Sequence, residues 1–157
     1  MFEIEISTKK GFKDSRGEHV LSDIRGISVA GVSKVAYSQI YLIDADVNAA
    51  DANLAASELL SDKITETYSV KSFVNPTANE PVSLGEPSVI EVWYKKGVTD
   101  TVAESVVKAV KDLGIKKSIT VKTGHRYYLS GKLSKKTLDT IATKLLANTI
   151  IQDYKVK

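Results

Sequence analysis

A basic segment in the second half of the chain has the side chains best suited to binding chemistry. It reads Lys122-Thr-Gly-His-Arg-Tyr-Tyr128 and places three side chains that can be cationic around a glycine. Such a group can bind a phosphate or face an acidic protein surface. The alternative is a solvated strand edge, where basic side chains discourage unwanted strand pairing. Together with the earlier Lys-Lys pair, the candidate partner or phosphate contacts are Lys95, Lys96, Lys122, Gly124, His125, Arg126 and Tyr127.

Patterns typical of catalysis or metal binding are scarce in this sequence. The two histidines, His19 and His125, lack neighbouring ligands at the spacing of a metal site. The chain has no cysteine, which excludes thiolate catalysis, zinc knuckles and disulfides. Neither a Gly-x-Ser-x-Gly elbow nor a glycine-rich phosphate loop occurs. We therefore expect no autonomous active site, no metal and no cofactor.

The charge is divided unevenly along the 157 residues, although the formal total is only +3. Residues 1–70 contain 7 Lys and Arg against 11 Asp and Glu, whereas residues 89–157 contain 14 against 6. An acidic first half would repel a phosphate backbone, so nucleic-acid binding has to be judged for each half separately. The first six residues mix acidic with apolar side chains and hold no run long enough for a signal peptide or membrane span, which predicts a cytoplasmic protein.

An internal repeat coincides with this division of charge. A shift of 86 residues places Ile4-Glu5 on Ile90-Glu91 and Leu59-Leu60 on Leu145-Leu146. In the middle, a one-residue adjustment pairs Tyr41-Leu42 with Tyr128-Leu129. The pattern predicts a tandem duplication with a first repeat at 1–70, a linker at 71–88 that contains all three prolines, and a second repeat at 89–157.

Each repeat has the same pattern of expected elements. Strands are expected first, at 2–6 and 89–94, followed by helices that begin at the capping boxes Ser15-x-x-Glu18 and Thr101-x-x-Glu104. A β-rich run follows, for which we predict one long strand, bulged or bent at Gly124, instead of a hairpin. A second helix and a short closing strand complete each repeat, with the closing strands predicted at 64–70 and 150–156.

These elements predict an α+β fold of two β-α-β-α-β units. A unit of about 70 residues buries only about 60% of its unfolded surface and is marginal alone. Two such units on one chain would gain stability by packing together. We therefore expect an intramolecular pseudo-dimer with antiparallel sheets and helices on one face, and further dimerisation stays open.

The order of the motifs resembles the PurS family, the small subunit of phosphoribosylformylglycinamidine synthase. The matching stretches of the second repeat are Lys96-Gly97-Val98-Thr99-Asp100, Lys122-Thr123-Gly124-His125, and the run from Leu145-Leu146-Ala147-Asn148 to Tyr154. The first repeat retains the first and third motifs, at 10–14 and 59–68, but has Val35-Ala36-Tyr37-Ser38 near the second. Only the linker is left uncovered by the resemblance.

The resemblance implies an adaptor in de novo purine biosynthesis. In this family the small subunit has no catalytic residues and works as a dimer within an ATP- and glutamine-dependent ligase complex. It holds a glutaminase of the PurQ type against a synthetase of the PurL type, so that ammonia passes between them. A tandem copy is similar to a standalone double subunit or to the N-terminal domain of a larger synthase. Our hypothesis is that the basic repeat faces the synthetase near its phosphate-bearing substrate, through His125, Arg126 and the Lys95-Lys96 pair.

Two other functions remain as alternatives. A single-stranded nucleic-acid-binding module would use the basic second repeat, with Trp93, Tyr127 and Tyr128 for stacking on bases. A small-ligand-binding regulatory domain of ferredoxin-like type would instead be stabilised by its ligand.

Overall fold

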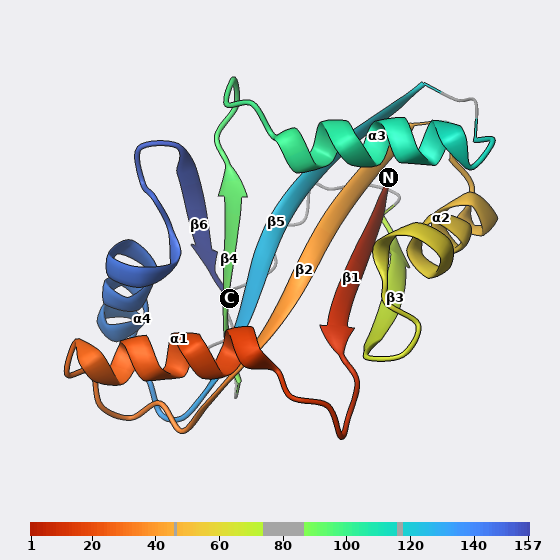
Figure 1. Cartoon of the computed structure of the whole chain (residues 1–157). Helices are drawn as coiled ribbons and strands as arrows, with labels where there is room; N and C mark the ends of the chain where they lie inside the picture. The colour runs from red at the N-terminus through yellow and green to blue at the C-terminus, as the bar shows by residue number, and fades with distance from the viewer. Residues whose placement is uncertain (46, 74–86, 116–117) are drawn as a thin grey trace. The chain divides into compact units, whose positions relative to one another are not determined.

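The computed structural model describes residues 1–45, 47–73, 87–115 and 118–157. Both repeats contain the predicted elements in the predicted order (Figure 1). The elements of the first repeat are β1 (Phe2–Thr8), α1 (Ser15–Gly26), β2 (Lys34–Ala45), α2 (Ala49–Ala55), the π-helical turn η1 (Ala56–Leu60) and β3 (Glu66–Ser72). Those of the second are β4 (Ser88–Tyr94), α3 (Thr101–Asp112), β5 (Ile119–Ser130), α4 (Lys135–Ile141), η2 (Ala142–Leu146) and β6 (Gln152–Val156).

The strands form one antiparallel sheet in the order β3-β1-β2-β5-β4-β6. In the first repeat β1 pairs with both neighbours, so that Ile4 lies opposite Tyr41 on β2 and Val70 on β3. In the second, β4 pairs with β6, and Ile90 lies opposite Val156. The α+β class and the two β-α-β-α-β halves are therefore confirmed. The long strand predicted in the second repeat is also continuous, from Ile119 through Gly124 to Ser130.

The backbone forms two compact units, and each takes segments from both repeats. Unit 1 contains Met1–Phe12, the chain from Ser38 through β3, and Thr99–Gly124. Unit 2 contains Lys13–Tyr37, β4 with the loop to Val98, and His125–Lys157. Helix α1 of the first repeat therefore belongs to the unit that holds β4, β6 and α4, and helix α3 of the second repeat belongs to the unit that holds β1, β3 and α2.

The apolar cores explain this exchange of helices. In unit 2, Val20 and Ile24 of α1 pack with Ile90 and Val92 of β4 and with Leu138 and other residues of α4. In unit 1, Val106 and Val110 of α3 pack with Ile4 and Ile6 of β1 and with Ala52 and Ala55 of α2. Because alternate strand residues point to opposite faces, the helices of each unit cover the face that carries these isoleucines.

Four details differ from the expectations. The N-caps are Asp14 and Asp100, one residue before the predicted Ser15 and Thr101, and each carboxylate accepts a hydrogen bond from the third residue after it. In the middle strand the structure favours a shift of 86 over the expected one-residue adjustment. Tyr37 N donates to Asp14 as Thr123 N donates to Asp100, and the buried Tyr41 then corresponds to the buried Tyr127.

The last two differences concern the loops. The closing strands begin two residues later than predicted, at Glu66 and Gln152, which leaves Ile64 and Ile150 in the preceding loops. Of the predicted linker, Pro76 and Pro81 lie outside the described residues, and the flanking strands reach Ser72 on one side and Ser88 on the other.

Candidate functional site

A carboxylate ties the start of each repeat's first helix to the long strand. Asp100 Oδ1 accepts from Ala103 N at 2.9 Å, and its Oδ2 accepts from Thr123 N at 2.9 Å. In the other repeat the Asp14 carboxylate accepts from Gly17 N at 2.8 Å and from Tyr37 N at 2.7 Å. The aspartate of the Lys-x-Gly-x-x-Asp-like motif therefore caps a helix and fixes it to a strand.

Two motifs of the second repeat meet at one end of β4. We define the unit 2 tip as residues 95–98 together with residues 147–151. Lys95 N donates to Ile151 O at 2.9 Å, and its Nζ donates to Thr149 O at 2.6 Å. The Asn148 side chain accepts from Ile150 N at 3.1 Å, while Asn148 N donates to the Gln152 side chain at 2.9 Å. The C-terminal motif is therefore a loop closed by its own side chains, with Lys95 pinning it to β4.

The unit 1 tip, residues 9–12 together with residues 61–65, has the same construction. Lys9 Nζ donates to Lys63 O, and Asp62 Oδ1 accepts from Ile64 N at 2.9 Å. Asp62 N donates to Glu66 Oε2 at 2.8 Å, as Asn148 N does to Gln152. Hydrogen bonds from the Thr65 and Ile64 backbone hold the pKa of Asp62 below its ordinary value.

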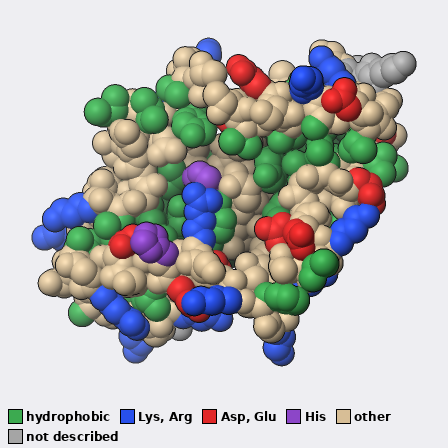
Figure 2. Space-filling model, in the orientation of Figure 1, with side chains coloured by type: hydrophobic (Ala, Val, Ile, Leu, Met, Phe, Trp, Pro, Cys, Tyr) green, Lys and Arg blue, Asp and Glu red, His purple; other side chains and the backbone are tan. Residues whose placement is uncertain are grey.

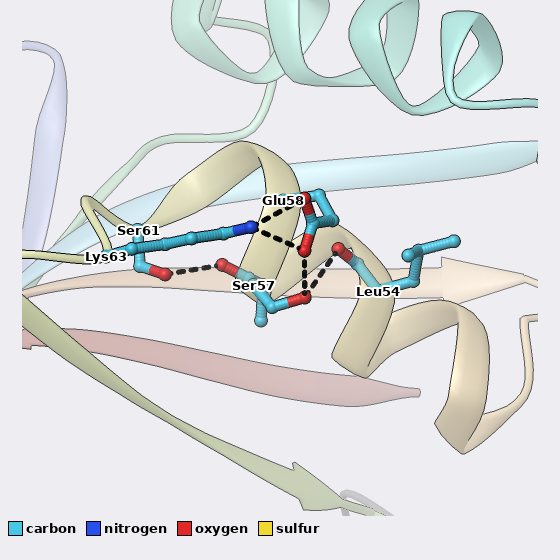
Figure 3. A network of polar contacts seen from close by, with 6 residues as sticks. Leu54, Ser57, Glu58, Ser61 and Lys63 are labelled. Atoms are coloured by element: carbon cyan, nitrogen blue, oxygen red, sulfur yellow. Dashed lines mark hydrogen bonds and ion pairs between the residues drawn. The ribbon is translucent and has the colours of Figure 1, made fainter.

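A second polar group borders the unit 1 tip (Figure 3). Lys63 Nζ lies 2.8 and 2.7 Å from the two carboxylate oxygens of Glu58, and this hydrogen bond lowers the pKa of Glu58. Ser57 Oγ donates to Leu54 O at 3.3 Å, and Ser61 Oγ donates to Ala56 O at 2.8 Å where the π-helical turn ends. Neighbouring side chains thus fix the loop that follows η1.

An aromatic and cationic cluster lies on the helix side of unit 2. Arg16 Nη1 donates to Tyr37 Oη at 3.0 Å, and the Arg16 guanidinium carbon lies 4.6 Å from the Tyr37 ring centre. Tyr37 Oη lies 2.8 Å from His125 Nδ1, and its ring is 5.5 Å from that of Tyr127. Tyr127 is only 5% exposed, and burial raises its pKa. His125 and Tyr127 therefore contact Tyr37 of β2, which Arg16 of α1 holds in turn, a long-range arrangement that local sequence did not reveal.

Arg126 lies on the opposite face of β5 and is paired internally. It is 6% exposed, and its Nε and Nη2 donate to Glu91 Oε1 at 2.8 and 2.6 Å. Lys157 Nζ donates to the same oxygen at 2.8 Å. Burial alone would raise the pKa of Glu91, but the hydrogen bond from Lys157 and the charge of Arg126 outweigh it, and the pKa is lowered.

The seven candidate residues therefore occupy several places. Lys95 is in the unit 2 tip, and the exposed Lys96 lies beside it. His125 and Tyr127 belong to the aromatic cluster, and Arg126 to the ion pair. In unit 1, Lys122 is exposed on β5, and Gly124 O accepts from Gln39 Nε2 at 2.9 Å. Strand alternation was the sequence signal that could have separated Arg126 from its two neighbours.

Charged side chains of both signs are mixed on the surface that Figure 2 shows. On the face drawn in Figure 2, Lys and Arg side chains are interspersed with acidic ones and form no continuous patch. Among the described residues, no group of three or more His, Asp or Glu side chains is arranged to hold a metal ion. In the same part of the chain, no helix is long and apolar enough to cross a membrane.

Comparison with known proteins agrees with the motifs. The model of one family, described as PurS, phosphoribosylformylglycinamidine (FGAM) synthase, matches residues 1–73 and 88–157. No curated protein matches the chain. The matched residues cover both repeats, and the resemblance predicted from the motifs is confirmed.

Proposed function

The chain belongs to the PurS family, and from this premise we propose that it is a non-catalytic adaptor component of FGAM synthase in de novo purine biosynthesis. It bridges the ATP-dependent synthetase part and the glutaminase part, so that ammonia released from glutamine reaches the synthetase. The observation that carries this proposal is the family match over both repeats, at 1–73 and 88–157.

A single chain with two PurS units can supply what two separate subunits would supply elsewhere. We take 1–70 and 89–157 as the duplicated units, with 71–88 as the linker. The exchange of α1 and α3 between the compact units supports this interpretation, because each unit needs a helix from the other repeat to complete its apolar core. The two repeats would then act together as a covalent dimer.

The side chains that suggested chemistry support an adaptor more than a nucleic-acid-binding module. Arg126 is committed to Glu91 in the interior, and Tyr127, named as a stacking residue, is only 5% exposed. The exposed Lys96 and Lys122, together with Lys95 next to Lys96 in the sequence, are the basic residues of the second repeat that we propose for contact with the synthetase. In this proposal Arg126 and Tyr127 hold β5 in place within unit 2 through Glu91 and Tyr37 and do not touch the synthetase.

Reconstitution with the synthetase and glutaminase parts of FGAM synthase tests the adaptor role. Turnover is measured with glutamine and, separately, with ammonium as the nitrogen source. We expect the protein to be required for glutamine-dependent turnover and to have little effect on turnover with ammonium, because only the first needs transfer between active sites. Equal glutamine-dependent rates with and without the protein would refute the proposal.

A further inference from the structure

The two tips have an isoleucine at the same exposed position. Ile150 is 83% exposed in the unit 2 tip, and Ile64 is 72% exposed in the unit 1 tip. Single exposed apolar residues are common on protein surfaces. Here, however, the exposure occurs twice, at positions that correspond under the shift of 86. Neither isoleucine is buried enough to contribute to a core, so folding does not explain its presence at both tips.

The loops hold these side chains in place before any contact is made. In the unit 2 tip, hydrogen bonds from Lys95 Nζ to Thr149 O at 2.6 Å and from Ile150 N to Asn148 Oδ1 at 3.1 Å surround Ile150. Gln152 N adds a bond to Asn148 O at 2.7 Å. Because the backbone is already ordered, binding through Ile150 would lose little conformational entropy.

The two tips have similar geometry but differ in charge. Three acidic residues in or next to the unit 1 tip, Glu58, Asp62 and Glu66, correspond to Lys144, Asn148 and Gln152 in or next to the unit 2 tip. Lys144 and Lys96 are both exposed, and Lys95 lies beside Thr149. The unit 2 tip is thus an apolar point with Lys96 and Lys144 exposed beside it, and its Lys95 lies 3.8 Å from Asp153. The unit 1 tip has Lys9 and Lys10 at the matching positions, but its Lys63 is paired with Glu58 at 2.7 Å, and Asp62 and Glu66 add further negative charge.

We infer that the unit 2 tip is a docking element, in which Ile150 inserts into an apolar pocket bordered by carboxylates on a protein partner. Ile151, which is 37% exposed, extends the apolar surface at its base. The lysines determine which partner is accepted, because charge complementarity governs encounter and specificity. This inference rests on the proposed adaptor function and assigns the unit 2 tip to the synthetase part.

The test measures binding of the full-length protein to the isolated synthetase part and, separately, to the glutaminase part. Ile150→Asn is compared with its matched control Ile64→Asn, and thermal unfolding verifies that both variants are folded. We expect Ile150→Asn to weaken binding to the synthetase about 10- to 100-fold, the effect of leaving one aliphatic side chain out of a pocket. Ile64→Asn should stay within about threefold of the wild type, because the carboxylates of Glu58, Asp62 and Glu66 around Ile64 would repel an acidic pocket.

Lys96→Glu should slow association with the synthetase and reduce the sensitivity of the rate to salt. Wild-type affinity in Ile150→Asn, or an equal loss in Ile64→Asn, would overturn the inference. If glutamine-dependent turnover still requires the protein in that case, the adaptor role stands and only the docking element is wrong. If the wild type binds neither part and turnover does not depend on it, the proposed function fails together with the inference.

Discussion

Replacing Arg126 with isoleucine tests whether the buried ion pair holds unit 2 together. The repeat itself suggests this substitution, since the residue that corresponds to Arg126 is the fully buried Ile40. Glu91 is only 4% exposed in the wild type. The substitution removes its hydrogen bonds of 2.8 and 2.6 Å from the Arg126 guanidinium. Lys157 remains at 2.8 Å from the carboxylate.

We expect the free energy of unfolding to fall by about 3 kcal/mol, the lower end of the range for breaking a buried pair, because Lys157 still compensates part of the Glu91 charge. Urea unfolding monitored by the fluorescence of Trp93, the single tryptophan, reports on this region, since its Nε1 lies 3.4 Å from Glu91 Oε2. The double variant Glu91→Leu/Arg126→Ile should be more stable than Arg126→Ile, since the Glu91 carboxylate is then no longer buried without its guanidinium partner.

The pH dependence gives an independent check. The pKa of Glu91 is lower in the folded protein than its ordinary value of 4.5. The stabilisation from its charged form is therefore fully present above that ordinary value and is lost as the pH falls through the folded-state pKa. The difference in stability between the wild type and Arg126→Ile should shrink in that acidic window. A loss under about 1 kcal/mol at neutral pH, or a double variant no more stable than Arg126→Ile, would show that the Glu91–Arg126 pair does not hold unit 2 together.

Three substitutions and one cleavage test other parts of the structure. Asp100→Ala removes a helix cap and the acceptor of Thr123 N, and chemical denaturation should show a loss of about 1–2 kcal/mol. Gly17→Ala should destabilise the protein by about 2–3 kcal/mol, since the added Cβ would lie 2.4 Å from Val35 O. Ala103 occupies the corresponding position in α3, and Ala103→Gly should cost only about 1 kcal/mol from helix propensity; equal losses in the two glycine–alanine exchanges would contradict this. Cutting the chain between β3 and β4 should leave separate halves without a cooperative thermal transition by circular dichroism, because each unit's core includes a helix from the other repeat, and mixing should restore it. A half that unfolds cooperatively alone would show that the exchanged helix is dispensable.

Local patterns explain why the elements and the repeat could be predicted. Helices and strands follow from the spacing of apolar residues, and Val20 and Ile24 or Leu138 and Ile141 are buried as their spacing predicts. The small errors have local causes too. Asp14 and Ser15 are both good N-cap residues, and the choice of Asp14 is linked to a bond to Tyr37 N, which comes from a strand far along the chain.

The α+β class, the duplication and the family motifs could be derived without coordinates, because they depend on short-range spacing and on residue identity. The fold was needed to show that α1 completes the core of the unit containing β4, that Arg126 is buried against Glu91, and that Ile150 is left exposed at a tip held by Lys95. Burial and ion pairing depend on contacts between residues tens of positions apart, and local sequence does not reveal such contacts. A lysine or arginine in a basic segment has the same chemistry in the sequence, whether the fold exposes its charge or neutralises it inside.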